Sequence, residues 1–366
     1  MSQPHVLHLV EYLYLGGIER LLEQLASQTR EGAKLSFFSY ETSELQGIGL
    51  KMREQGHAVH LYKKSQGRDW KLVKKLSELI KKEKIDVIHT HDFGPMEYAV
   101  LLKMFNPKLK LIHTQHTLHH FINNKKYCLA FQVASPFYDK IIAVSEHVKR
   151  TLLESCPYMY KKNFIVIPNG VDTSHFEYQP QPAETSEKKL RLVNIARISP
   201  EKNLDFLLQT CLYLKKAGVD FEFHHAGTTS DTLVIEKIHQ FIFDHQLENE
   251  VTLHGYTDQA KEILALGDYF ISASKTEGHP VAVLEAMAAG KICLCSDIPP
   301  HREIGEEAIV FFDINEPHSL FEALTDLSLV ETENQARKQL SRNIICEKFS
   351  LNSMVENYVA NYTTRS

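Results

Sequence analysis

The chain of 366 residues lacks the features that mark several classes of protein. Its six cysteines form no CxxC pair and no regular disulfide spacing, which favours a reducing compartment over a secreted disulfide framework. No apolar run approaches the ~20 residues that a membrane span needs. The N-terminus also lacks the charged region and the cleavage site of a signal peptide. We therefore expect a cytoplasmic protein.

Charge is distributed unevenly along the chain. Residues 1–176 hold 24 Lys and Arg against 17 Asp and Glu, whereas residues 177–366 hold 17 against 29. The basic half could face phosphate-bearing partners or an anionic membrane surface, or its charge could be chance clustering on a solvated surface. No basic patch is interleaved with aromatic residues and the isoelectric point is near 6.5, so nucleic-acid binding is disfavoured.

The length predicts two domains, because single hydrophobic cores usually stop growing near ~250–300 residues. Short apolar runs alternate with amphipathic helical stretches such as residues 70–82, which indicates a doubly wound α/β fold. In the first half the predicted parallel strands cover residues 6–10, 85–89, 110–114, 140–144 and 164–167.

This pattern stops at a stretch rich in Pro, Ser and acids, QPQPAETSEKK at residues 179–189, and then restarts. Strands of the second half are predicted at residues 190–196, 221–226, 251–255, 269–273 and 292–295. We therefore predict two tandem Rossmann-like α/β domains with parallel sheets that face a central cleft. Their expected bounds are 1–176, a linker at 177–189, 190–345, and a C-terminal helix at 346–366 that crosses back to the first domain.

Two loops carry residues suited to phosphate. Gly16 and Gly17 follow the first strand and open a helix, where the backbone and the helix N-terminus can approach an anion. Alternatively they form only a strand-to-helix turn. Arg197 and Lys202 flank Pro200, a residue that can start a helix, and this arrangement suits a diphosphate. Surface salt bridges are the alternative for the two cations.

The stretch EGHPVAVLE at residues 277–285 places two carboxylates around a predicted helix start. The helix is expected from Pro280 to Ala289 and ends at Gly290. Glu277 precedes it and Glu285 lies about a turn and a half inside. Such acids suit two parts of an elongated ligand better than a catalytic acid/base pair. A capped helix start with one satisfied acid is the alternative.

Histidines concentrate in HTQHTLHH at residues 113–120. Imidazoles at such spacings can share a zinc ion, but no carboxylate or cysteine accompanies them closely. We favour a basic, ligand-facing loop that contains His119, His120, Lys125 and Lys126; a solvated loop stays open. The lysines of helix 70–84 could contact anionic lipid, or they could only solvate one face of a helix that covers the sheet.

Taken together, these motifs resemble the retaining, nucleotide-sugar-dependent glycosyltransferases of family four, which have the two-domain GT-B fold. The resemblance covers most of the chain and follows the family's order of motifs. The matching stretches are GGIER at 16–20, HTQHT at 113–117, IIAVSE at 141–146, IPNGVD at 167–172, ARISPEKN at 196–203, LHGYTD at 253–258 and EGHPVAVLEAMAAG at 277–290, which contains an E-x7-E motif.

The resemblance implies roles for individual residues of the second domain. Arg197 and Lys202 would bind the donor diphosphate, and Glu285 would hold the ribose hydroxyls. Glu277 and the backbone from Gly278 through His279 and Pro280 to Val281 would hold the donor sugar. Tyr256 would lie near the base.

In the first domain, the resemblance implies that Gly17, beside Gly16, lends its N–H to the phosphates. His116 would lie close to the reacting sugar, with His113 the less favoured candidate. His113, His119 and His120 would then face the acceptor. Together with Arg197, Lys202 and Glu277, His116 completes the expected catalytic set.

The implied reaction moves a sugar from a nucleoside diphosphate to a hydroxyl of a glycan or lipid-linked acceptor, as in cell-surface polysaccharide, lipopolysaccharide or glycolipid assembly. UDP is the first choice of nucleotide and GDP the second. No cofactor is expected, and the absence of a D-x-D motif argues against metal dependence. The alternatives for the protein are a catalytically silent sugar-nucleotide-binding module and an epimerase or phosphorylase relative. The alternative for the acceptor is a small molecule.

Overall fold

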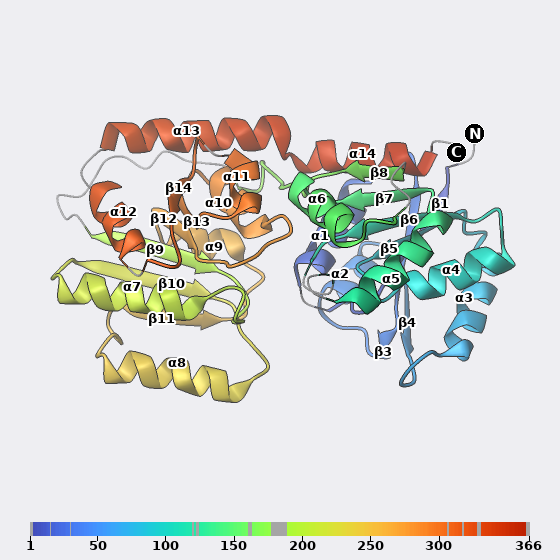
Figure 1. Cartoon of the computed structure of the whole chain (residues 1–366), viewed down its shortest axis with the longest axis horizontal. Helices are drawn as coiled ribbons and strands as arrows, with labels where there is room; N and C mark the ends of the chain where they lie inside the picture. The colour runs from blue at the N-terminus through green and yellow to red at the C-terminus, as the bar shows by residue number, and fades with distance from the viewer. Residues whose placement is uncertain are drawn as a thin grey trace. The chain divides into compact units, whose positions relative to one another are not determined.

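The computed structural model describes residues 3–14, 16–29, 31–118, 121, 124–159, 163–176, 189–305, 307–316, 318–327 and 331–363. The chain forms two compact units, which we call the first unit (Met1–Gly170 with Leu351–Ser366) and the second unit (Val171–Ser350). Each is a mostly parallel sheet covered by helices (Figure 1). The predicted doubly wound α/β fold is confirmed. Of the predicted linker at 177–189, only Lys189 lies within the described residues.

The sheet of the first unit has the strand order β3-β4-β2-β1-β5-β6-β7-β8. All pairs are parallel except β3 with β4. Because β2 and β5 lie on opposite sides of β1, the carboxyl ends of β1 and β5 form the topological switch point of this sheet. The strands are β1 (His5–Val10), β2 (Lys34–Ser39), β3 (Glu41–Thr42), β4 (Ala58–Lys63), β5 (Val87–His91), β6 (Lys110–Gln115), β7 (Lys140–Ala143) and β8 (Phe164–Val166).

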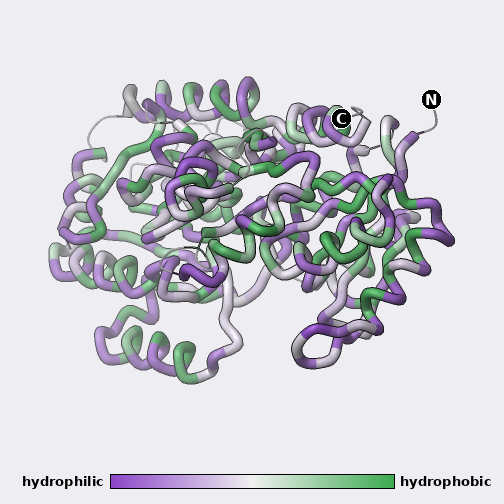
Figure 2. The backbone as a smooth tube through the Cα atoms, turned by 45° about the vertical axis from the view of Figure 1, so that its right-hand side comes forward, coloured by the Kyte–Doolittle hydropathy of each residue, from purple (hydrophilic) through white to green (hydrophobic). Residues whose placement is uncertain are grey.

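Helices cover both faces of this sheet, and each buries an apolar stripe. In Figure 2 their turns alternate between green and purple, as expected for helices with one face on a core. The helices of the first unit are α1 (Gly17–Gln28), α2 (Gly47–Glu54), α3 (Trp70–Glu83), α4 (Met96–Phe105), α5 (Lys125–Ala134), the 3₁₀ helix η1 (Ser135–Phe137), α6 (Glu146–Ser155) and α14 (Leu351–Thr363).

The last helix of the chain, α14, belongs to the first unit although it follows the whole of the second (Figure 1, red). Its buried side chains recur at helical spacing and join the core formed by β1, β2 and α1; they are Leu351, Met354, Val355, Tyr358 and Tyr362. The hydroxyl of Tyr362 lies 2.8 Å from Nδ1 of His89 on β5. Thus α14 closes one face of the first sheet.

The second unit contains a six-stranded parallel sheet in the order β11-β10-β9-β12-β13-β14, with its switch point at β9 and β12. Its strands are β9 (Leu190–Ile195), β10 (Phe221–Ala226), β11 (Val251–Gly255), β12 (Tyr269–Ser272), β13 (Ile292–Ser296) and β14 (Val310–Phe312). Its helices are α7 (Leu204–Lys216), α8 (Thr232–Asp244), α9 (Ala260–Ala265), α10 (Val281–Ala288), α11 (Pro299–Gly305), α12 (Ser319–Leu327) and α13 (Glu331–Lys348).

One local prediction is wrong: Pro200 does not start a helix. The backbone N–H of Lys202 donates to the carbonyl of Ser199 at 3.0 Å, so these residues form a turn. Asn203 then adopts a left-handed conformation with φ of 57°. A right-handed helix cannot pass through such a residue, and α7 therefore begins at Leu204.

Because Tyr358 is only 1 % exposed within the first unit, we predict that Tyr358→Ala lowers the stability of that unit by about 3–5 kcal/mol, the usual cost of a large buried aromatic. Hydrogen exchange read by mass spectrometry along a urea series would follow the two units separately. The exposed Glu356→Ala on the same helix is the control and should change stability by less than about 0.5 kcal/mol. Equal effects of the two substitutions would refute the role of α14.

Candidate functional site

In the second unit, four of the predicted donor residues follow the two strands where the strand order reverses, and a fifth follows the edge strand. Arg197 and Lys202 follow β9, Glu277 and Gly278 follow β12, and Tyr256 follows β11. The strands are parallel, so their carboxyl ends lie at one edge of the sheet. Ligands of doubly wound folds bind at this edge, beside the switch point.

The loops after β9 and β12 are joined by an ion pair between Nζ of Lys202 and Oε1 of Glu277. Only 23 % of the Lys202 side chain and 12 % of the Glu277 side chain are exposed. The same carboxylate oxygen accepts a hydrogen bond of 2.7 Å from Oγ of Ser274, and the backbone N–H of Lys275 donates to the carbonyl of Glu201 at 2.8 Å. The two loops thus hold Lys202 and Glu277 in a defined geometry.

Arg197 is the exposed cation of this edge. In the described parts of the chain, no hydrogen bond or ion pair engages its guanidinium. Its loop is held through the backbone, since the N–H of Ile198 donates to the carbonyl of Thr228 at 3.0 Å. Gly227 permits this approach: a Cβ there would lie 1.8 Å from the carbonyl oxygen of Ala196. The guanidinium can therefore bind an anion without first leaving a partner.

The start of α10 supplies the remaining donor residues. Pro280 is the N-cap, Val281 is the first helical residue, and Gly290 follows the helix with a φ of 67°. Glu285 is 3 % exposed. The backbone N–H groups of a helix start favour anions and polar oxygens, so this segment is suited to a polar ligand.

The side chain of His279 lies in the core. Its ring is 5.2 Å from that of Phe349, and burial lowers the pKa of His279 to about 3. The imidazole is therefore neutral near pH 7. In this position the backbone of His279 can meet a ligand more readily than its ring can.

In the first unit, α1 begins at Gly17 directly after the loop that follows β1. Space beside Gly17 is open, whereas a Cβ at Gly16 would lie 2.2 Å from a carboxylate oxygen of Glu19. Gly17 is therefore the accessible member of the pair. Its amide, at the positive end of the helix, is available to an anion.

Asp92, which the sequence analysis did not identify, holds the chain segment after β6 in place at the switch point of the first unit. Its Oδ1 accepts from the backbone N–H groups of His116 at 2.9 Å and Thr117 at 3.3 Å, and from Nε2 of Gln115 at 3.0 Å. Burial raises the pKa of Asp92 to about 7, against the lowering effect of the two amides. Asp92 directly follows β5, and a polar residue shortly after the strand predicted at residues 85–89 was the signal that could have identified it.

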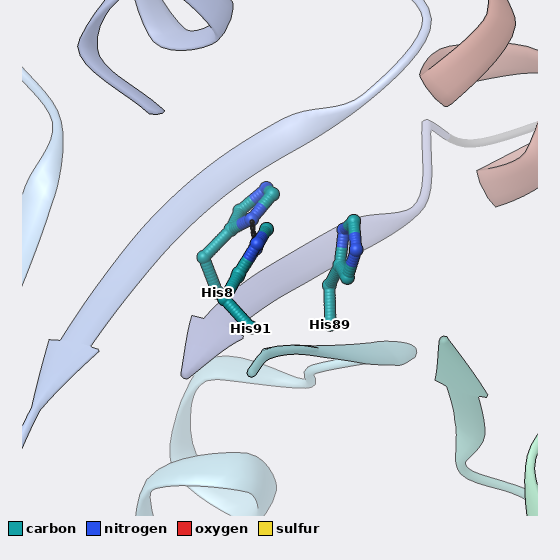
Figure 3. A group of neighbouring side chains, drawn as sticks. All are labelled: His8, His89 and His91. Carbon is teal, nitrogen blue, oxygen red and sulfur yellow. Dashed lines mark hydrogen bonds between the residues drawn. The ribbon is translucent and has the colours of Figure 1, made fainter. Parts of the chain in front are cut away.

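His116 lies beside this network and is 7 % exposed. Its Nε2 is 3.0 Å from Nδ1 of His91, and Nε2 of His91 is 2.9 Å from Nδ1 of His8. These two histidines of the strands were also missed. Figure 3 shows His8 and His91 joined in this way, with His89 beside them.

His113, by contrast, faces the opposite side of the sheet. It is fully buried against Phe131 and Tyr138, and its nitrogens lie 2.9 Å from Oγ1 of Thr90 and 3.1 Å from Oε1 of Gln115. An acceptor cannot reach the ring here, so His113 supports the Asp92 network instead. His119 and His120 lie outside the described residues.

The zinc interpretation of residues 113–120 is not supported by the geometry, because His113 and His116 face different sides of the sheet. The histidines within metal-ligand distance of one another are His8, His89 and His91. Both nitrogens of His89 have partners, Tyr362 and Thr114, and those of His91 bond His8 and His116. This arrangement fits a hydrogen-bonded network.

The raised pKa of Asp92 predicts a pH-dependent effect of Asp92→Asn. Between the ordinary value of 3.8 and the folded value of about 7, the folded protein keeps a proton that the unfolded chain releases, so the parent protein loses stability as pH rises through this window. The Asn variant lacks this loss. Urea midpoints from pH 4 to 8 should show the variant gaining on the parent with rising pH; a constant difference would contradict the assignment.

Two family models match the chain side by side. The first, Glycosyltransferase Family 4, matches residues 15–175, and the second, Glycosyl transferases group 1, matches residues 176–345. Together they cover the candidate residues described in each of the two units.

Relatives and solved structures agree with these matches. A Bacillus subtilis (strain 168) protein with the provisional name glycosyltransferase EpsF is 24 % identical over 341 residues, which are 87 % of this chain and 86 % of that protein. The UDP-Gal:α-D-GlcNAc-diphosphoundecaprenol α-1,3-galactosyltransferase of Escherichia coli is 25 % identical over 63 % of this chain and 62 % of its own length. The HepE protein of Anabaena, crystallised with UDP and glucose, superposes with a TM-score of 0.82 at 18 % identity, covering 98 % of this chain and 99 % of HepE.

The fold, the order of the motifs and the family models lead to the same assignment. Each of the two α/β units carries polar residues at its switch point, and the two matched regions together cover residues 15–345 without a gap. The chain belongs to the family-four glycosyltransferases of the GT-B fold.

Proposed function

We propose that this glycosyltransferase moves a sugar, with retention of anomeric configuration and without a metal ion, from a nucleoside-diphosphate donor to a hydroxyl of a glycan or lipid-linked acceptor. UDP is the favoured nucleotide and GDP the second choice. The observation that carries the proposal is the ion pair of Lys202 and Glu277 at the switch point, beside the exposed Arg197. Cations for a diphosphate and an acceptor for sugar hydroxyls are thereby held within one site.

The charges of this site match those of the departing group. When the bond from the sugar to the nucleotide breaks, negative charge collects on the diphosphate. Arg197 and Lys202 stabilise that charge, and removing one such group commonly costs ~2.7–4 kcal/mol of transition-state stabilisation, by analogy with an oxyanion hole. In the proposed reaction, these two cations take the place that a metal ion has in other transferases.

Carboxylates and backbone groups position the two parts of the donor. Glu277 accepts hydrogen bonds from the sugar while the backbone of Gly278–Val281 contacts it. Glu285 binds the ribose hydroxyls and Tyr256 lies by the base. Because Lys202 and Ser274 already orient the Glu277 carboxylate, this side chain loses little conformational freedom when the sugar binds.

In the proposed retaining step, the acceptor hydroxyl attacks the anomeric carbon from the face that the diphosphate leaves. One carbon–oxygen bond forms as the other breaks, and the hydroxyl proton passes to the departing phosphate. The amide of Gly17 donates to the phosphates, and His116 bonds the reacting sugar. No covalent sugar–enzyme intermediate is needed.

The first prediction from this proposal concerns nucleotide binding. In a thermal-shift panel of UDP, GDP, ADP, CDP and dTDP, one diphosphate, with UDP expected, should raise the melting temperature of the parent protein. Arg197→Ala/Lys202→Ala should abolish the shift because the phosphates lose both cations. Lys216→Ala, an exposed lysine at the end of α7, is the control and should respond like the parent.

Failure of all five nucleotides would count against the transferase and favour a binding module of another kind. If one nucleotide binds, its sugar donors can be screened with EDTA present. We expect that EDTA leaves turnover unchanged. NMR of the product should show the anomeric configuration of the donor sugar. Loss of turnover in EDTA, or inversion, would refute those two details, and nucleotide binding without turnover would favour a catalytically silent module.

We further propose a lipid-linked acceptor and peripheral contact with the cytoplasmic face of a membrane. Five lysines on α3 are all exposed: Lys71, Lys74, Lys75, Lys81 and Lys82. On α5, Leu129 and Val133 are 62 % and 64 % exposed, one turn apart. The Escherichia coli relative named above acts on a diphosphoundecaprenol acceptor. Within the described residues, no helix is long and apolar enough to cross a bilayer.

Co-sedimentation with vesicles containing phosphatidylserine tests this contact. The parent protein should pellet at low salt and less at high salt, because charge attraction is screened. Each lysine near the surface contributes about 1 kcal/mol, so Lys71→Ser/Lys81→Ser/Lys82→Ser should weaken binding by roughly 100-fold. The triple variant Lys216→Ser/Lys237→Ser/Lys261→Ser, with the same change of charge in the second unit, should pellet like the parent. Absence of pelleting by the parent would remove the membrane proposal.

A further inference from the structure

A row of three imidazoles leads from the interior of the first unit to His116. His8 lies within β1, His91 ends β5, and His116 follows β6; these three strands are neighbours in the sheet. The nitrogen separations along the row are 2.9 Å between His8 and His91 and 3.0 Å between His91 and His116. Figure 3 shows the first of these bonds. The three rings are therefore a continuous hydrogen-bonded series.

All three rings are neutral near pH 7. Burial lowers the pKa of His8 and of His116 to about 3 and places that of His91 well below its ordinary value. A neutral imidazole carries one N–H and one bare nitrogen. If Nδ1 of one ring donates to Nε2 of the next, the following ring must also donate from Nδ1. The row therefore has only two arrangements, and each fixes the tautomer of all three rings together.

The far end of the row distinguishes the two arrangements. His8 is fully buried and stacks on Phe37 with ring centroids 5.1 Å apart, and in the described part of the chain no group hydrogen-bonds its Nε2. If the row pointed toward His8, this nitrogen would carry a buried N–H without an acceptor. Orphaned buried N–H groups are rarer than acceptors with unused lone pairs. This outweighs the modest preference of an isolated imidazole for a proton on Nε2.

We infer that His8 and His91 are positioning residues that hold His116 in the tautomer with its proton on Nδ1, so that His116 donates a hydrogen bond at the reacting sugar. The inference rests on the proposed function for the role of His116. Within the described residues, no hydrogen bond engages Nδ1 of His116, which leaves this atom for the ligand.

Nitrogen NMR of the full-length protein labelled with ¹⁵N-histidine tests the tautomer directly, because protonated and bare ring nitrogens resonate far apart. The signals of His116 are assigned by their loss in His116→Asn. In the parent protein, Nδ1 of His116 should be protonated and Nε2 bare. The opposite pattern would overturn the inference without any variant of His8.

Two substitutions at His8 test whether it transmits the tautomer. His8→Phe keeps an aromatic ring but removes the donor, so His116 should become a mixture of tautomers. His8→Asn places an amide N–H near the position of Nδ1 and should restore the parent pattern. His89→Phe alters the same buried layer outside the row, where His89 bonds Tyr362 and Thr114, and should leave His116 unchanged. A parent-like His116 in folded His8→Phe would refute the transmission.

A metal ion shared by His8, His89 and His91 is the competing account of this cluster. Adding zinc should leave the ring-nitrogen signals of these residues in place, because hydrogen-bonded partners occupy both ring nitrogens of His89 and of His91. Zinc-dependent shifts of all three would overturn the row of neutral imidazoles.

Activity provides a second readout once a donor is known. His8→Phe should lower kcat about tenfold, the effect of one lost hydrogen bond, with nucleotide binding unchanged, and His8→Asn should recover most of it. An unchanged kcat in a variant whose tautomer has changed would refute the role of Nδ1 in transfer. A failure of the nucleotide panel would instead refute the proposed function, while the NMR result on the tautomer would still stand.

Discussion

The ion pair between Lys202 and Glu277 connects two loops that are separated by 75 residues along the chain, and the geometry of the proposed donor site depends on it. The loops lie together because β9 and β12 are parallel neighbours at the point where the strand order reverses. A half-buried ion pair is not chiefly a source of stability, since desolvation offsets much of its attraction. Its effect here is orientation: the cation and the carboxylate each have one defined position before a ligand binds.

In the first unit, the polar groups at the switch point are also oriented before a ligand binds, but with less charge. At its switch point, Asp92 holds the backbone after β6 through two amide hydrogen bonds. Burial raises the pKa of this carboxyl to about 7, because its effect outweighs the lowering effect of those two amides. The neighbouring imidazoles are neutral for the same reason. Orientation in this unit therefore comes from hydrogen bonds whose direction is fixed, and in the second unit from opposite charges.

Sequence patterns predicted the fold, because β-branched runs and helix periodicity are local signals. They also identified candidate donor residues, which the structure places after β9, β11 and β12. They did not predict Asp92, His8 or His91 as site residues. His8 and His91 sit in or at the end of apolar strands, where a single imidazole is usually a satisfied core residue. Their shared role depends on pairing β1 with β5, which joins residues 83 positions apart. The turn at Ser199–Asn203 was missed because Pro200 is equally suited to a turn and to a helix start.

The parity of a β-strand explains why one pair of histidines acts together and another does not. Side chains two positions apart share a face of the sheet. His89 and His91 do so, with ring centroids 4.3 Å apart. His113 lies within β6 and packs in the core against Phe131 and Tyr138, whereas His116 directly follows the strand and its ring lies against His91 of β5. A spacing that would suit a shared ligand on a helix therefore separates these two residues, and the ring of His116 is hydrogen-bonded to His91 of a neighbouring strand.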